Sequence, residues 1–285
     1  MNIKIVLLLS IIVFCLIFGS VRREKLEDKE DKEVKQGIHL IIQYYNDKNP
    51  ERAEENNECL RNNLNNSTIA TIHNIIEKDT IMPKEFNDHP KLLNVPIDYE
   101  KTGSIKGRLT YKYAFDYSRD NIPNDEVVAI CNLDIYLDDS EAWKNVKTDF
   151  FKVNNDKKCL SLTRYDKNNK NITSSPYSSD TWVYLNPIKV KDFCNFGVGN
   201  GPRCDSVINK VFYDSGYKLF NWPQKYRTNH VDFVRGDPGA QILNDKTDKL
   251  PSKLYNTYGV LHTSWEQDWE SILHNKTIQK FTVGD

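Results

Sequence analysis

The sequence of 285 residues has almost no net charge, and this absence excludes one broad class of function. Its 39 lysine and arginine residues nearly balance its 40 aspartate and glutamate residues, which leaves a formal net charge of −1 at pH 7. Proteins that bind nucleic acid through its phosphates carry a clustered excess of basic side chains. We therefore expect no nucleic acid partner. The chain is still long enough to bury a sizeable hydrophobic core.

The six cysteines lack the spacing of a metal module. No two of them form a CxxC pair, and their spacing matches no known zinc module. Cys131 is predicted to be a buried strand residue and Cys59 to lie on a helix. A disulfide between Cys194 and Cys204 requires an oxidising compartment.

The N-terminal apolar segment lacks a signal-peptide cleavage site. Residues 5–21 form a 17-residue apolar run, and no small residues in an A-x-A arrangement follow it. The run is at the low end for spanning a bilayer and long for the core of a signal peptide. We favour an uncleaved signal anchor, residues 1–21, over a cleaved signal peptide. Residues 22–36 are predicted to be a charged, solvated stalk, and residues 37–285 a globular domain.

Apolar runs of strand type alternate with amphipathic runs of helix type along this domain. A strand over 38–45, a helix over 51–64 and a strand over 68–76 form a βαβ unit with a right-handed crossover. His73 is predicted to be a packed strand residue and not a ligand. Further strands are expected at 127–131, 159–163 and 180–185, further helices at 109–119 and 139–146, and a surface excursion with one short strand at 80–107. The fold class is therefore α/β, with a mostly parallel sheet flanked by helices.

The segment Glu126–Asp139, EVVAICNLDIYLDD, contains the first candidate site. A buried strand ends at Cys131, and Asn132 and Asp134 follow it directly. Open α/β sheets bind their ligands outside the carboxyl ends of their strands. Carboxylate and amide oxygens there suit Mg²⁺ or Mn²⁺, and such an ion suits a diphosphate. The other interpretation is an ordinary strand followed by a helix N-cap in the Asp-Asp-Ser sequence.

A second candidate segment lies later in the chain. A turn with Gly197, Gly199 and Gly201 precedes Asp205, which lies at or near the start of an apolar helix. The helix is expected to end at Gly216, a strand to follow it over 217–220, and His230 comes 25 residues after Asp205. Taken separately, Asp205 is typical of a helix N-cap and His230 of a loop histidine.

The order of these parts resembles the GT-A type of glycosyltransferase fold. More narrowly, the chain is similar to a glycosyltransferase-like family of large DNA viruses, algae and protists. The matching phrases are QYYNDKNPERAEENNECLRNNLNN, VAICNLDIYLDD, SSDTWVYLNP and GPRCDSVINKVFYDSGYKLFN, within residues 38–232. The resemblance implies a Rossmann-like nucleotide-diphospho-sugar transferase domain with a mixed, mostly parallel sheet.

The resemblance also implies a donor site. Asn132 and Asp134 fall where such enzymes carry the D-x-D that holds a divalent ion on the donor's two phosphates. The sequence has N-x-D there, so one charged ligand is replaced by an amide. His230 falls at a further contact to the metal or diphosphate. Arg108 stands where a basic group could meet a nucleotide phosphate, although a surface arginine is the simpler interpretation.

On the acceptor side, Asp205 falls where inverting members of the family have the base that activates the acceptor. Asp180, at the start of its strand, is a second candidate for this side. The aromatic residues Trp182, Tyr184 and Trp222 could stack on a sugar, but their positions favour the hydrophobic core.

The expected function is transfer of a hexosyl-type sugar from a nucleotide-sugar donor to a hydroxyl on a glycan, protein or lipid, with Mn²⁺ or Mg²⁺. One rival hypothesis is a catalytically inactive relative that binds glycan or nucleotide, which Asn132 favours. Another is a metal-dependent phosphotransfer or hydrolysis enzyme using Asp134 and Asp138, although the D-x-D-x-T/V pattern of aspartyl-phosphate enzymes is absent.

The implied function places the domain on the lumenal side of the endoplasmic reticulum or Golgi, behind a single-pass anchor. The basic residues that flank the apolar run favour the opposite orientation. Arg22, Arg23 and Lys25 outnumber Lys4, and the positive-inside rule would keep that flank cytosolic. The orientation therefore stays open.

Overall fold

The computed structural model describes residues 37–97, 108–153, 157–166, 179–193, 196–199 and 204–231, and the backbone of two short strands near the C-terminus. These two strands, β11 (Leu261–His262) and β12 (Thr282–Val283), pair antiparallel. The predicted anchor (1–21) and stalk (22–36) lie outside the described residues, so the domain boundaries stay predictions. None of the helices in the described ranges is long and apolar enough to cross a membrane.

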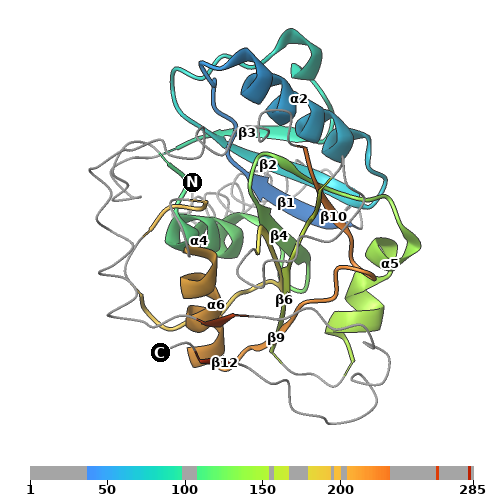
Figure 1. Cartoon of the computed structure of the whole chain (residues 1–285), viewed down its shortest axis with the longest axis vertical. Coiled ribbons are helices and arrows are strands. Elements are labelled where there is room, and N and C mark those ends of the chain that lie inside the picture. The colour runs from blue at the N-terminus through green and yellow to red at the C-terminus, as the bar shows by residue number, and fades with distance from the viewer. Residues whose placement is uncertain are drawn as a thin grey trace, which may run out of the picture. The chain divides into compact units, whose positions relative to one another are not determined.

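A seven-stranded sheet forms the centre of the domain, with the strand order β3-β2-β1-β4-β8-β6-β9 (Figure 1). Every neighbouring pair is parallel except the two that involve β8, which runs against β4 and β6. This arrangement confirms the predicted α/β fold with a mixed, mostly parallel sheet. The strands are β1 (Ile38–Ile42), β2 (Ile69–Ile76), β3 (Leu92–Pro96), β4 (Val127–Cys131), β6 (Lys158–Leu162), β8 (Thr181–Leu185) and β9 (Lys218–Phe220).

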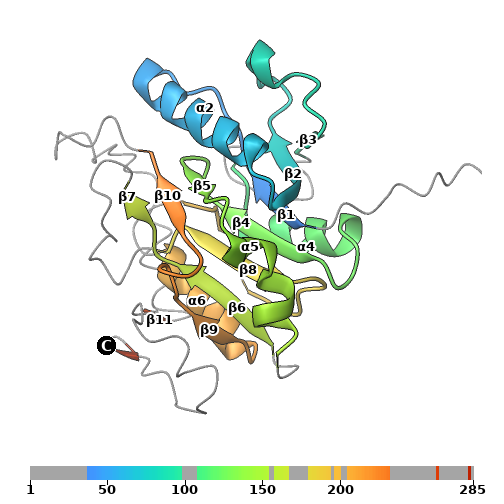
Figure 2. The same cartoon turned by 90° about the vertical axis from the view of Figure 1, so that its right-hand side faces the viewer.

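Helices cover both faces of the sheet (Figures 1 and 2). Alternate residues of a strand point to opposite faces, and the core accordingly divides into two hydrophobic clusters. Val128 and Ile130 of β4 pack in the cluster that includes residues of α4 (Tyr111–Asn121) and α6 (Cys204–Asp214). Val127 and Ala129 pack in the cluster with residues of α2 (Pro50–Asn65), of α5 (Glu141–Lys144) and of the π-helical turn Lys147–Phe151 that follows α5. A 3-10 turn, η1 (Lys84–Phe86), precedes β3.

The helix starts follow from local capping. Asn49 caps α2 by accepting a hydrogen bond from the Glu51 amide at 2.9 Å, and Pro50 occupies the first helical position, where its missing N–H costs nothing. Thr110 caps α4 by accepting from the Tyr113 amide at 3.2 Å. This cap explains why the helix predicted from residue 109 begins at Tyr111.

A second, three-stranded sheet was missed by the sequence analysis. It has the order β5-β10-β7, from β5 (Ile135–Leu137), β10 (Thr228–His230) and β7 (Tyr165–Asp166). The helix expected over 139–146 is shorter, and His230 lies in a strand and not in a loop. Asn63 of α2 fixes β5, because its amide donates to the Ile135 carbonyl at 2.9 Å and accepts from the Leu137 amide at 3.1 Å. These pairings join segments far apart in sequence, so local patterns do not reveal them.

A pair of buried histidines joins β1, β2 and α4. His39 Nδ1 lies 3.0 Å from His73 Nε2, and His73 Nδ1 lies 2.9 Å from the Tyr117 hydroxyl. His73 is therefore a packed strand histidine, as predicted. Burial lowers the pKa of His73 to about 3, with the neighbouring His39 adding to the effect, and burial also lowers the pKa of His39.

These lowered pKa values predict acid sensitivity of the fold. The unfolded chain takes up protons near pH 6.5 while the folded histidines stay neutral, so stability is complete above pH 6.5 and falls as the pH drops toward 3. Each histidine contributes a slope of up to about 1.4 kcal/mol per pH unit. Urea unfolding of His73→Gln between pH 7.5 and 4.5 should show a lower free energy of unfolding with a flatter pH dependence than the unmodified protein.

The control for this experiment is His89→Gln, which removes a histidine outside the buried pair. The pH dependence of the unfolding free energy should flatten more in His73→Gln than in His89→Gln, because only His73 belongs to the buried pair. Equal slopes for His73→Gln and the unmodified protein would show that the pair does not govern acid sensitivity.

Candidate functional site

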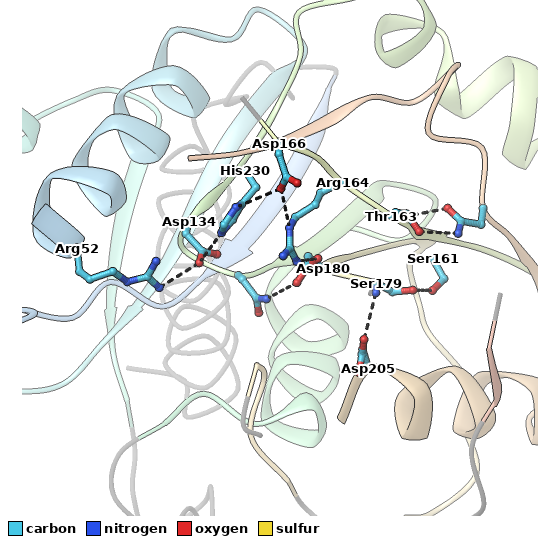
Figure 3. A network of polar contacts seen from close by, with 12 residues as sticks. Arg52, Asp134, Ser161, Thr163, Arg164, Asp166, Ser179, Asp180, Asp205 and His230 are labelled. Atoms are coloured by element: carbon cyan, nitrogen blue, oxygen red, sulfur yellow. Dashed lines mark hydrogen bonds and ion pairs between the residues drawn. The ribbon is translucent and has the colours of Figure 1, made fainter. Parts of the chain in front are cut away.

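The reversed direction of β8 brings several polar residues to one edge of the sheet. A parallel strand presents its last residues at this edge, whereas β8 presents its first. Thr181, at the start of β8, pairs with Cys131 at the end of β4 and with Leu162 at the end of β6. The residues next to these three positions therefore meet, and they form the polar network of Figure 3.

Asp134 and His230 form the first part of this network. The small sheet pairs Ile135 with His230, and the Val231 amide donates to the Asp134 carbonyl at 3.2 Å. As a result His230 Nε2 lies 3.2 Å from Asp134 Oδ2. Arg52, in the first turn of α2, places its Nη2 3.2 Å from the same oxygen. One carboxylate oxygen thus faces both an imidazole and a guanidinium group.

Arg164 connects this part to the second one. Its guanidinium group pairs with Asp180 and lies 3.6 Å from Asp166 Oδ1, and Asp166 Oδ1 lies 3.7 Å from His230 Nδ1. Asn132 donates its side-chain amide to Asp180 Oδ1 at 3.0 Å. Asp180 is therefore held by a guanidinium on one oxygen and an amide on the other.

Asp205 forms the third part, in the first turn of α6. Its Oδ2 accepts a hydrogen bond from the Ser179 amide at 3.2 Å. Ser179 is fixed in turn, because its hydroxyl lies 2.9 Å from the Ser161 hydroxyl, which donates to Asn209 Oδ1 at 2.7 Å. The Asp205 carboxylate is thus aligned by the backbone next to Asp180.

The environments of Asp134 and Asp205 move their pKa values in opposite directions. Burial alone would raise the pKa of Asp134, but the hydrogen bond to His230 and the charges of Arg52 and Arg164 hold it well below its usual range. Burial raises the pKa of Asp205 to about 7, and the negative charge of Asp180 adds to this rise. A pair of carboxylates whose pKa values are pushed apart is typical of sites that divide two chemical roles.

The donor atoms of Asp134 and His230 suit a divalent cation. Carboxylate oxygen is a preferred ligand of Mg²⁺ and Mn²⁺, imidazole is a common metal ligand, and His230 Nε2 lies 3.2 Å from Asp134 Oδ2. Among the described residues, no group of three or more histidine, cysteine, aspartate or glutamate side chains could hold a metal. The described residues thus do not form a complete set of protein ligands for a metal ion.

The other residues predicted for the site are placed as follows. The amide of Asn132 is committed to Asp180, so Asn132 is not oriented as a partner of Asp134. Arg108 is exposed and lies outside the network of Figure 3. Asp138 accepts from the Ser140 hydroxyl at 3.1 Å, near the start of α5. Trp182, Tyr184 and Trp222 are buried, which confirms that they belong to the core.

Arg52, Arg164 and Asp166 were missed by the sequence analysis. Arg164 and Asp166 follow directly after the strand expected at 159–163, and Arg52 lies at the start of the helix that follows the first strand. The rule that pointed to Asn132 and Asp134, that ligands bind at the carboxyl ends of strands, would have found Arg164 and Asp166 too, but not Arg52.

Comparison with known proteins gives a likeness in fold only. No family model matches the sequence, and no curated protein sequence matches it. A crystal structure of residues 1–349 of S. aureus TarS is similar with a TM-score of 0.43 and 10% sequence identity, over 69% of this chain and 60% of that chain. At this TM-score the likeness carries no argument about the fold or the function of this chain.

Gly199 shows how closely the glycine turn approaches the site. Its φ of +65° is in the left-handed region, and a Cβ atom there would lie 2.8 Å from Asn132 Oδ1. Gly216, after α6, has a φ of +82° but open space around it. The two glycines share the backbone requirement, and only Gly199 has the close contact. Gly201 of the same predicted turn lies outside the described residues.

Alanine at the two glycines should separate these effects. Gly216→Ala should cost about 1 kcal/mol of unfolding free energy from the left-handed conformation alone. Gly199→Ala should cost more, because it also displaces the Asn132 side chain. Chemical denaturation measures both costs. In an Asn132→Ala background the excess cost of Gly199→Ala should disappear, and an unchanged excess would contradict the proposed contact.

Proposed function

We propose that the protein is a glycosyltransferase that moves a sugar of hexosyl type from a nucleotide-sugar donor to a hydroxyl acceptor with a divalent cation. The observation that carries this proposal is the difference in pKa between the carboxyl groups of Asp134 and Asp205. One carboxylate is strongly acidic beside an imidazole and a guanidinium group, and the other has a pKa near neutrality. Both lie at the ligand-binding edge of a mixed α/β sheet.

On the donor side, Asp134 and His230 would hold Mn²⁺ or Mg²⁺. When bound, the cation would neutralise the negative charge that develops on the diphosphate as the sugar leaves. The charges of the site favour this role, since the carboxylates of Glu55, Asp134, Asp166 and Asp180 outnumber the guanidinium groups that pair with them. A diphosphate would be repelled by this excess of negative charge unless a cation came with it.

On the acceptor side, Asp205 would remove the proton from the acceptor hydroxyl. A general base is most effective when its pKa lies near the working pH, and the pKa of Asp205 is raised to about 7. Asp180 is less suited to this step, because Arg164 and Asn132 occupy its oxygens. We assign to Asp180 the role of a fixed negative charge beside Asp205.

The remaining expectations belong to the same proposal. The acceptor would be a glycan, protein or lipid hydroxyl, and residues 1–21 would anchor the domain to a membrane of the endoplasmic reticulum or Golgi. A second candidate function is a catalytically inactive protein that binds the donor without turnover. It is favoured by Asn132, whose amide is committed to Asp180 where an active relative is expected to offer a second metal-binding carboxylate.

Donor turnover by the full-length chain tests the proposal. One of the UDP-sugars or GDP-sugars should release its nucleotide in the presence of Mn²⁺ and not in EDTA. Asp134→Ala should lower this rate at least about 100-fold, because the cation loses its carboxylate ligand. Asp139→Ala removes a neighbouring acid that contacts Ser67, and it should keep the unmodified rate. Metal-dependent binding without release would support the inactive relative instead.

The pH dependence of transfer should identify Asp205 as the base. Because the deprotonated carboxylate is the active form, kcat/KM should rise with pH and level off above about 7. Asp205→Asn should lower kcat by roughly 100-fold or more while leaving the binding of the nucleotide unchanged.

Asp180→Asn supplies the control for the pH at which kcat/KM rises. Removing its negative charge should lower the pKa of Asp205, so the rise in kcat/KM should move to lower pH. A pH profile that stays the same in both variants would exclude Asp205 as the base.

A further inference from the structure

The oxygen that would bind the cation is already occupied by a side chain of the protein. Asp134 Oδ2 lies 3.2 Å from His230 Nε2 and 3.2 Å from Arg52 Nη2. A divalent cation held by Asp134 and His230 would contact the same oxygen. It would then lie beside the guanidinium group, where like charges repel. The guanidinium and the cation are therefore competitors for Asp134.

The side chain of Arg52 can move away from Asp134 more easily than that of Arg164 can leave its acids. Its side chain is 27% exposed, and besides Asp134 (Figure 3) it pairs with Glu55, one turn along its own helix. The other guanidinium group of the network, that of Arg164, is only 10% exposed and lies between Asp166 and Asp180. Of these two arginines, Arg52 can therefore turn away from its acid at the lower cost.

After leaving Asp134, the guanidinium group of Arg52 would bind the diphosphate of the donor. A guanidinium group has a planar, forked set of donors that matches phosphate oxygens. A diphosphate bound to the cation at Asp134 lies within reach of the same side chain, since both contact one carboxylate oxygen. The arriving phosphates would then replace the negative charge that Arg52 loses.

We propose that Arg52 occupies the cation position at Asp134 in the free protein and transfers to the donor diphosphate when cation and donor bind together. This inference rests on the proposed donor site. It assigns to Arg52 a binding role that the sequence did not indicate, and it predicts that cation and diphosphate strengthen each other's binding. By linkage, the factor of enhancement is the same in both directions.

Titration of the full-length chain with Mn²⁺ alone, and with inorganic pyrophosphate at saturating Mn²⁺, tests the exchange. In Arg52→Gln, Mn²⁺ alone should bind about two- to five-fold more tightly, because a partly exposed ion pair no longer opposes it. Pyrophosphate should bind about ten-fold more weakly, because a charged hydrogen-bond donor is lost. Calorimetry or electron paramagnetic resonance of free Mn²⁺ reports both constants without any turnover.

Two further variants keep the test decisive. Arg61→Gln removes an arginine of the same helix that pairs with Glu85, away from the network, and it should change neither constant. If Arg52→Gln is poorly folded because the buried Glu55 has lost its ion pair with Arg52, Arg52→Gln combined with Glu55→Gln removes the charge of Glu55 and should show the same two shifts.

The outcomes also separate this inference from the proposed function. If the unmodified chain shows no Mn²⁺-dependent binding of pyrophosphate, the cation site itself is wrong, and the exchange fails with it. If the unmodified chain binds both and Arg52→Gln equals it in both titrations, the cation site stands and the exchange is wrong. Weaker binding of Mn²⁺ alone in Arg52→Gln would also overturn the exchange, since Arg52 would then support the site and not compete for it.

Discussion

The antiparallel course of β8 is the constraint on which the candidate site depends. Were β8 parallel to its neighbours, its last residues would lie at this edge, and Asp180 would be at the opposite end of the sheet. Reversal places Asp180 next to Asn132 and Arg164, which follow the ends of β4 and β6. The contacts that join Asp134 to Asp180 and the contacts that join Ser179 to Asp205 then lie side by side (Figure 3).

The three-stranded sheet is the second requirement, because it brings His230 of β10 next to Asp134 and Asp166. β10 pairs with β5 on one side and with β7 on the other, so His230 faces Asp134 and Asp166 at once. Asn63 stabilises this arrangement from α2 by satisfying backbone groups of β5. The buried side chain of Asn63 therefore holds β5, the strand that follows Asp134, in place.

The sequence predicted the parts of the fold that depend on local patterns. The apolar run 127–131, the amphipathic helix after Pro50 and the buried role of His73 all follow from periodicity and capping within a few residues, and the structure confirms them. Asp134 was found from its position after a buried strand, whereas Asp205 was selected because the order of the parts resembles a known family.

What the sequence could not supply is which of these residues meet. The pairing of β10 with β5 joins residues almost a hundred positions apart, and no local pattern encodes it. The contact of Arg52 with Asp134 likewise depends on how α2 packs over β5. Charged residues on amphipathic helices are common on solvent-exposed faces, so Arg52 carried no distinguishing signal.

Arg164 gives the site a physical reason to act as one unit. It lies between Asp180, which raises the pKa of Asp205, and Asp166, which faces His230. Between Asp134 and the carboxylate of Asp205 lie His230, the guanidinium group of Arg164 and the two acids that pair with it. In a partly buried network such charges are weakly screened. A charge bound near Asp134 would thus alter the electrostatic field at Asp205, because Asp180 already raises the pKa of that carboxyl group.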